Sequence, residues 1–158
     1  MSRFNFRRFT YWCFIVYCVM VFSVLFLRGI GGDYDFSSYP YWKRVMDRTN
    51  LVPFATIGEQ LGSIANSIYN RRVAIRNLLA NLLLFVPMGL YLPLRWNKLR
   101  QFGKCLWVWL GLILIIEIIQ VLTLQGSFDI DDVMLNTLGF FVGYGLFVIL
   151  SLFVREER

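Results

Sequence analysis

Four long runs of apolar residues dominate the chain, at about 10–27, 77–94, 105–124 and 133–154. A helix needs about 20 apolar residues to cross the hydrocarbon core of a bilayer, and the third run has that length. Only helices and closed barrels satisfy their backbone hydrogen bonds in lipid. The pattern therefore predicts an all-α integral membrane bundle of four transmembrane helices, in one domain over 1–158.

The composition agrees with a core that is solvated by lipid. Apolar residues make up 58% of the chain and charged residues only 16%, whereas soluble domains have about half and about a quarter. Lys and Arg lie mainly at the ends of the apolar runs, so the net charge of +6 is an orientation signal and not a sign of nucleic-acid binding. The chain has no His, which excludes His-ligated metals and nucleophiles activated by His. We expect no metal and no cofactor.

The basic residues of the short flanks predict the orientation. The tail before the first run carries three arginines, and the link between the second and third runs carries four basic residues and no acid. The link between the third and fourth runs has three Asp residues and no Lys or Arg. By the positive-inside rule, both termini should be cytoplasmic. The long first loop, 28–76, disagrees with this rule, because several Arg and Lys residues would then lie outside.

This first loop is too long for a simple connection, so we expect it to be structured. Aromatic residues at 39–42 suit the headgroup level of the membrane. The segment 57–75 predicts an interfacial helix that leads into the second apolar run. Together these features predict a long interfacial loop on the extracellular side.

Polar side chains inside a bilayer are costly, so those within the runs are candidates for function. Their spacing places them together on one helical face in each of the last three runs. At 1.5 Å per residue, Glu117 lies about 18 Å from the inner end of its helix, and the other polar groups lie near the outer ends of theirs. We predict that five of them converge in the outer half of the bundle: Asn81, Glu117, Gln120, Asp132 and Asn136.

Structural roles are the alternative for some of these polar residues. Asp129 or Asp131 could be only the N-cap of the fourth helix. The amides of Asn77 and Asn81 could only hydrogen-bond neighbouring helices. Glu117 is the hardest to explain by packing, because a carboxyl group at that depth must be protonated, paired or solvated.

Oxygen ligands for a metal could come from Glu117, Asp129 and Asp132 across helices. The acidic segment 129–132 lacks the central Gly and the terminal Glu of an EF-hand loop, however. We therefore predict no metal site.

Two glycines and a proline predict how the helices pack. Gly139 and Gly143 are four residues apart, a spacing typical of close contact between membrane helices. Pro87 should kink the second helix.

Five short segments together resemble a known family. They are NLVPF at 50–54, NLLLFVPMG at 81–89, EIIQ at 117–120, FDIDD at 128–132 and NTLG at 136–139. In this order they resemble the VanZ-like family of small bacterial membrane proteins. The resemblance covers about 50–144, and the first helix and the C-terminal tail carry none of its motifs.

The resemblance implies a location in the bacterial plasma membrane and a role in tolerance of teicoplanin-type glycopeptide antibiotics. It also implies a set of site positions: Asn50, Pro53, Phe54, Asn81, Pro87, Gly89, Glu117, Gln120, Asp129, Asp132, Asn136 and Gly139. Some family members carry a basic residue just before the Asp pair, whereas 125–128 has none. Arg72 and Arg76 are the candidates to supply a cation instead.

We therefore predict a non-enzymatic envelope protein that binds an amphiphilic ligand at the outer leaflet. The ligand would be a membrane lipid, a lipid-linked wall precursor or a lipoglycopeptide, and the predicted binding residues are Asn81, Glu117, Gln120, Asp129, Asp132, Asn136, Arg72 and Arg76. Carboxylates and amides would recognise sugar, amine or peptide groups, and arginines would meet phosphate.

Two alternatives stay open. One is an enzyme that acts on lipid headgroups, with Glu117 as general base and Asp129 or Asp132 assisting. The other is a small proton-coupled transporter in which Glu117 titrates. With so few helices, a transporter would need to form a homo-oligomer.

Overall fold

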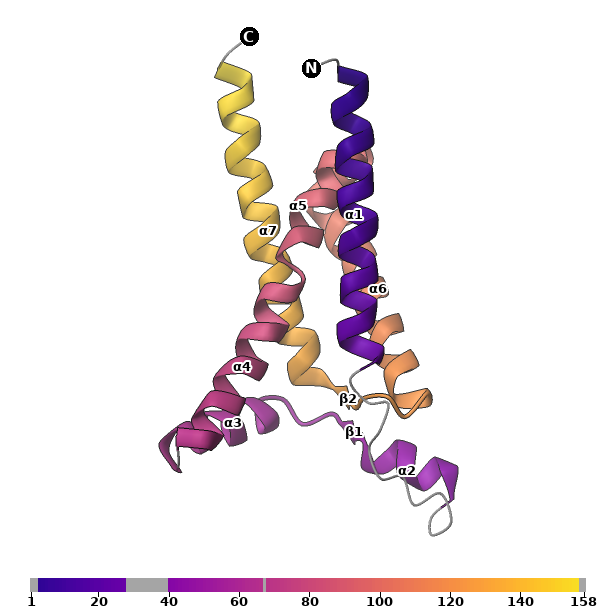
Figure 1. Cartoon of the computed structure of the whole chain (residues 1–158), viewed down its shortest axis with the longest axis vertical. Helices are drawn as coiled ribbons and strands as arrows, with labels where there is room; N and C mark the ends of the chain where they lie inside the picture. The colour runs from indigo at the N-terminus through magenta and orange to yellow at the C-terminus, as the bar shows by residue number, and fades with distance from the viewer. Residues whose placement is uncertain (1–2, 28–39, 67, 157–158) are drawn as a thin grey trace.

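The computed structural model describes the backbone of residues 3–27, 40–66 and 68–156 (Figure 1). Within these residues, four helical segments are long and apolar enough to cross a membrane. They are α1 (Arg3–Phe26), α4 followed by α5 (Ile68–Leu84 and Val86–Arg95), α6 (Phe102–Leu122) and α7 (Ile130–Glu156). The predicted all-α membrane bundle with four transmembrane helices is confirmed.

The start of α1 and the end of α7 lie at the same end of the bundle (Figure 1). At this end, the short 3-10 helix η1 (Asn97–Arg100) joins α5 to α6. The opposite end carries the first loop, which contains α2 (Tyr41–Asp47), β1 (Thr49–Asn50) and α3 (Ala55–Asn66). We call these three elements the loop layer. Tyr39, part of the predicted aromatic cluster, lies outside the described residues.

The second crossing starts earlier than the predicted range 77–94. Its apolar span covers 28 residues, Ile68–Arg95. The basic residues Arg71, Arg72 and Arg76 lower the mean hydropathy of the first turns of α4, so the apolar run starts after them. These turns can still belong to the crossing, because long basic side chains can reach the headgroups from a helix end. The predicted interfacial helix at 57–75 is shorter for the same reason: α3 ends at Asn66, and the rest of that range belongs to α4.

The predicted kink in this crossing is a full break between two helices. The interruption falls at Phe85, whose backbone has φ −106° and ψ 6°. Pro87 lies in the first turn of α5, where its missing N–H costs no helical hydrogen bond. The proline thus starts a new helix and does not bend a continuous one.

The other helices also begin before their apolar runs, because polar residues can occupy helix ends outside the hydrocarbon. The early start of α7 matters most. It begins at Ile130 and not near 133, so Asp131 and Asp132 lie in its first turn. There both side chains can turn back toward the loop layer and the neighbouring helices.

Glycines bring α7 into direct backbone contact with the second crossing. A Cβ atom at Gly139 would overlap the carbonyl oxygen of Leu82, and one at Gly143 would overlap that of Val86. From the other side, a Cβ at Gly89 would overlap the carbonyl oxygen of Phe140. The predicted role of Gly139 and Gly143 in close helix packing is confirmed, and Gly89 completes the contact.

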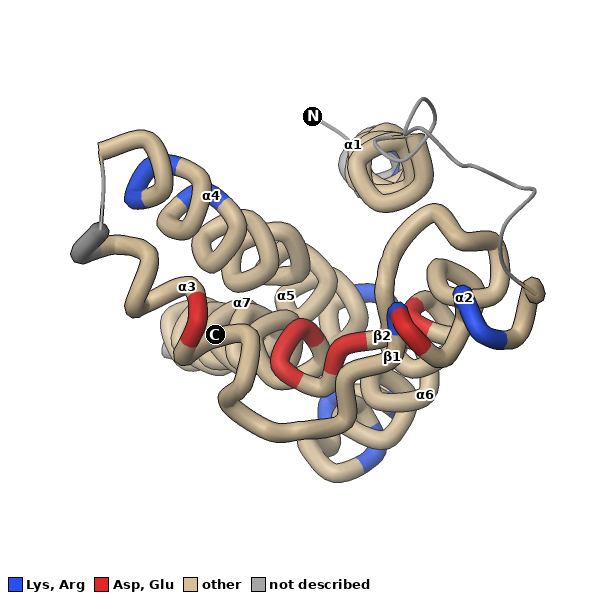
Figure 2. The backbone as a smooth tube through the Cα atoms, turned by 90° about the horizontal axis from the view of Figure 1, so that it is seen from below, with Lys and Arg blue, Asp and Glu red and all other residues tan. Residues whose placement is uncertain are grey.

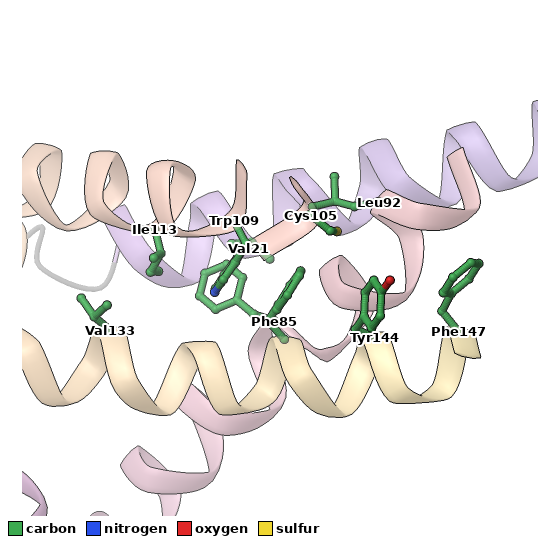
Figure 3. Close-up of a cluster of buried hydrophobic side chains, with 10 residues drawn as sticks. Val21, Phe85, Leu92, Cys105, Trp109, Ile113, Val133, Tyr144 and Phe147 are labelled. Atoms are coloured by element: carbon green, nitrogen blue, oxygen red, sulfur yellow. The ribbon is translucent and has the colours of Figure 1, made fainter. Parts of the chain in front are cut away.

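A cluster of buried apolar side chains fills the middle of the bundle (Figure 3). Trp109 of α6 stacks on Phe140 of α7 with ring centroids 5.1 Å apart and planes 3° apart. Its indole Nε1 donates a hydrogen bond to Thr137 Oγ1 at 3.1 Å, so the polar atom of the buried ring has a partner. α6 and α7 are therefore fixed to each other two helical turns away from Glu117.

α1 contacts the bundle through a few specific side chains. The Phe14 ring stacks on Tyr91 at 3.7 Å between centroids, and the Tyr17 hydroxyl donates to the Leu84 carbonyl oxygen at 2.8 Å. Leu84 lies just before the break at Phe85, where a carbonyl loses its helical partner. Tyr17 thus satisfies a backbone group that the break exposes.

Candidate functional site

Most of the acidic side chains of the bundle gather at the end that carries the loop layer. Figure 2 shows acidic positions grouped where β2 (Phe128–Asp129) leads into α7. Asp129, Asp131 and Glu117 are buried, whereas Asp132 is half-buried. Their hydrogen-bond partners divide these four carboxylates into two groups with different roles.

The first group begins with a short pairing of two distant segments. β1 and β2 run parallel, with Thr49 opposite Phe128 and Asn50 opposite Asp129. This register places the Asp129 carboxylate next to the loop layer. Its Oδ2 accepts a hydrogen bond from Thr56 Oγ1 at 2.5 Å, and its Oδ1 accepts one from Asn50 Nδ2 at 3.4 Å.

Asp129 is also the N-cap of α7. Its Oδ1 accepts a hydrogen bond from the backbone N–H of Asp131 at 2.9 Å, which satisfies a donor that the first helical turn leaves unpaired. Of the two predicted N-cap candidates, the structure therefore assigns this role to Asp129. Asp131 caps a different helix.

Asp131 closes the N-terminus of α3 from across the fold. Its two carboxylate oxygens accept hydrogen bonds from the backbone N–H groups of Phe54, at 2.6 Å, and Ile57, at 3.0 Å. α3 has no Ser, Thr, Asp or Asn at its own N-cap, and Phe54 there takes a positive φ of 64°. A negative charge at this position also complements the helix dipole. We call Asp129 and Asp131 with these partners the carboxylate latch.

The second group lies between α4, α6 and α7, and we call it the inner cluster: Asn81, Glu117, Asp132 and Asn136. Asn81 Nδ2 donates a short hydrogen bond to Asp132 Oδ1. Glu117 interacts with the backbone N–H of Asp129 and, electrostatically, with the carboxylates of Asp132 and Asp129. The structure thus brings these predicted residues together.

Two oxygen atoms of the inner cluster are buried without a hydrogen-bond partner. They are Glu117 Oε2 and Asn136 Oδ1, in residues that are each only 3% exposed. Asn136 lies one helical turn after Asp132 on α7, so the two side chains share a face. A buried acceptor without a donor costs about 1–3 kcal/mol, so this arrangement is unfavourable unless a donor arrives.

Gln120 points away from the inner cluster. Its Nε2 donates to the Leu25 carbonyl oxygen near the end of α1, at 3.2 Å. The backbone carbonyl oxygen of Gln120 accepts hydrogen bonds from the N–H groups of Gln125 and Gly126 at the end of α6. The structure therefore places Gln120 in the packing of α1 against α6.

Arg72 and Arg76 have exposed side chains on α4. In Figure 2, the basic positions of α4 lie apart from the acidic positions at the start of α7. The groups that act electrostatically on Glu117 are other carboxylates, and neither arginine is among them. The predicted supply of a cation by these two residues has no support in this geometry.

The geometry offers little for metal binding or covalent catalysis. Within the described residues, no group of three or more His, Cys, Asp or Glu side chains could hold a metal ion. Thr137 already accepts the Trp109 hydrogen bond, and Ser127 is exposed in the loop before β2. Neither hydroxyl is positioned by a base as nucleophilic catalysis requires.

Several partners of the carboxylate latch were missed from the sequence: Thr56 and the backbone N–H groups of Phe54 and Ile57. One signal was present. Pro53 precedes a helix that has no capping side chain of its own, so its first N–H groups need a partner from elsewhere. Nothing in the sequence shows that this partner is Asp131.

Fold and site together define a class: a multi-pass helical membrane protein with a buried amide and carboxylate cluster near one end of its bundle. The model of the VanZ/LLP1 family matches residues 14–151, so the chain belongs to this family. The match extends beyond the 50–144 region of the motifs and includes the second half of α1. The expectation that the first helix carries no family signal was therefore wrong.

One curated relative is Protein VanZ of Enterococcus faecium. It is 29% identical over 109 residues, which cover 69% of this chain and 58% of the relative. The chain thus spans less than two thirds of that protein's length. No solved structure matches the chain.

Proposed function

We propose that this VanZ-like membrane protein binds an amphiphilic ligand at the outer leaflet of the bacterial plasma membrane and thereby contributes to glycopeptide tolerance. The candidate ligands are a membrane lipid, a lipid-linked wall precursor and a lipoglycopeptide. The observation that carries the proposal is the pair of unpartnered buried oxygens, Glu117 Oε2 and Asn136 Oδ1. Buried polar groups in folded proteins are nearly always paired, so two unpaired acceptors in one cluster support binding of a group that carries donors.

The loop layer supports an amphiphilic ligand over a soluble one. Leu51, Val52 and Phe54 are strongly exposed in the connection from β1 to α3, beside the carboxylate latch. Exposed apolar side chains at the end of a membrane bundle suit contact with acyl chains or the headgroup region. A ligand with an apolar tail and a polar head would meet both features at once.

The outer-leaflet assignment depends on the orientation. We expect a cysteine introduced at Ser127 to react with an impermeant thiol reagent on intact cells, and one introduced at Asn97 not to react. Both side chains are exposed, and the two loops lie at opposite ends of the bundle. The parent protein is the control for the native cysteines, Cys13, Cys18 and Cys105. The opposite labelling pattern would place the site on the cytoplasmic side and contradict the proposal.

The role of the inner cluster is tested by glycopeptide tolerance in a sensitive bacterium that expresses the protein. We expect Glu117→Gln to abolish the tolerance that the wild-type protein confers, at unchanged abundance in the membrane. Gln is nearly isosteric, so packing should survive while the carboxylate is lost. Glu59→Gln, at an exposed position of α3, is the matched control and should retain full tolerance. Full tolerance from Glu117→Gln at normal abundance would contradict a carboxylate-dependent mechanism.

A further inference from the structure

Two acceptor atoms of the inner cluster have no donor. Both are oxygens, and the hydrogen bond that Asn81 donates in this cluster goes to Asp132. Glu117 and Asp132 are acidic side chains close enough to interact electrostatically. A group that completes this cluster must therefore bring hydrogen-bond donors, and a positive charge on it would be attracted to the two acidic side chains.

From this geometry, and resting on the proposed function, we infer that the ligand group bound by the inner cluster is a primary ammonium. An ammonium with three N–H donors has the number needed for Glu117 Oε2, Asn136 Oδ1 and the remaining oxygen of Asp132. Charge-assisted hydrogen bonds of this kind are the strong ones. A cation between Glu117 and Asp132 would also favour the ionised forms of both carboxyl groups.

Two other cations fit the cluster less well. A metal ion needs several ligands at short range, and the described Asp and Glu residues do not form such a group. A quaternary ammonium has no N–H donor and is usually held by aromatic faces. The indole of Trp109 lies two helical turns from Glu117, and it is already stacked on Phe140 and packed against Phe85.

Asp132 is the least buried acidic side chain of the inner cluster. This side chain is half-buried, whereas Glu117 and Asn136 are nearly fully buried. An ammonium at the head of an amphiphile would meet Asp132 first and then pass to the deeper oxygens. Aminolipids and amine-bearing amphiphiles of other origin share this chemistry.

Binding to the purified full-length protein in detergent tests the inference with two pairs of probes. The first pair is phosphatidylethanolamine and phosphatidylcholine with identical acyl chains. The second pair is dodecylammonium and dodecyltrimethylammonium below their micellar concentrations. Each pair differs in the N–H donors of its cation, and the two pairs separate a lipid headgroup from a simple amine.

We expect the primary ammonium to bind about tenfold more tightly than its quaternary analogue in at least one pair, measured by titration calorimetry, because charge-assisted hydrogen bonds are lost on methylation. Glu117→Gln should abolish this preference, and Glu59→Gln should keep it. A preference in the first pair would identify the headgroup as the source, and one in the second pair alone would identify a non-lipid amine.

Equal binding within both pairs, or a preference that Glu117→Gln retains, would overturn the inference. The tolerance assay distinguishes failure of this inference from failure of the proposed function. Loss of tolerance in Glu117→Gln without any preference for a primary ammonium would reject the ammonium and leave the ligand-binding proposal standing. A preference for the ammonium that Glu117→Gln abolishes, without any effect of this substitution on tolerance, would keep the ammonium ligand and reject the proposed contribution to tolerance.

Discussion

The carboxylate latch and the inner cluster both contain buried acidic side chains and lie close together, but they differ in how completely their oxygens are hydrogen-bonded. Asp131, which is fully buried, has both oxygens occupied by backbone N–H groups, and Asp129 is held by Thr56, Asn50 and the start of α7. Glu117 is almost as buried, but one of its oxygens has no partner. Burial alone therefore does not separate structural carboxylates from candidate binding groups, whereas hydrogen-bond satisfaction does.

The comparison also explains why the two groups occur side by side. The latch attaches the loop layer to the start of α7, and Asp132 follows Asp131 directly in the same helical turn. A rigid first turn of α7 fixes the direction of the Asp132 side chain toward Asn81. Preorganisation of this kind lowers the entropy that a ligand must overcome on binding.

Loss of the Asp131 side chain should have the largest effect on stability. Asp131→Ala leaves the N–H groups of Phe54 and Ile57 without partners, so we expect the free energy of unfolding to fall by about 3 kcal/mol or more. Chemical denaturation in detergent, followed by circular dichroism, measures this change. A loss below about 1 kcal/mol would show that the latch contributes little and would remove the basis of the comparison.

Removal of a single hydroxyl from the latch should have a smaller effect. Thr56→Val keeps the shape of the side chain but loses the hydrogen bond to Asp129 Oδ2, and we expect a cost of about 1–2 kcal/mol. Thr123→Val is the matched control, because its hydroxyl donates only to carbonyls at the exposed end of α6. The same denaturation experiment should show little change for the control. Equal costs for the two substitutions would indicate a general effect of losing Thr.

Neutralisation of the α4 arginines should have the smallest effect. Arg72→Gln and Arg76→Gln change exposed side chains, so stability should stay within about 0.5 kcal/mol of the wild-type value. Glycopeptide tolerance should also be retained, since neither arginine acts on Glu117 in this structure. A complete loss of tolerance in either variant would show that the site needs a cation from the protein and would argue against an ammonium in the ligand.

Local sequence patterns predicted the parts of the molecule that depend on helix geometry. Apolar run length gave the four crossings, and the spacing of Asp132 and Asn136 placed both on one face of α7. The position of Asn81 relative to Asp132 followed from the expected depth of each residue in the bilayer. The close approach at Gly139 followed from the small side chain.

Contacts between distant segments could not be predicted in the same way. The β1–β2 pairing joins residues that are far apart in the chain, and it decides that Asp131 caps α3. Gln120 shares a helical face with Glu117 in sequence, but the neighbour that α6 meets at that level is α1. The start of α4 could not be predicted because the arginines near its N-terminus give this part of the helix the low hydropathy of a loop.

The most direct test of the division between latch and inner cluster is the thermal unfolding midpoint of two charge-neutralising variants, Glu117→Gln and Asp131→Asn, in the same detergent without ligand. In Glu117→Gln, the side-chain oxygen can still accept from the Asp129 N–H. The unpaired acceptor Oε2 is replaced by an NH2 group, so the midpoint should equal or exceed that of the wild type. Asp131→Asn replaces one of the two accepting oxygens by an NH2 group, which cannot accept from the N–H of Phe54 or Ile57, so its midpoint should fall by several degrees. A fall for Glu117→Gln as large as that for Asp131→Asn would contradict the account, because Glu117 would then hold the fold as Asp131 does.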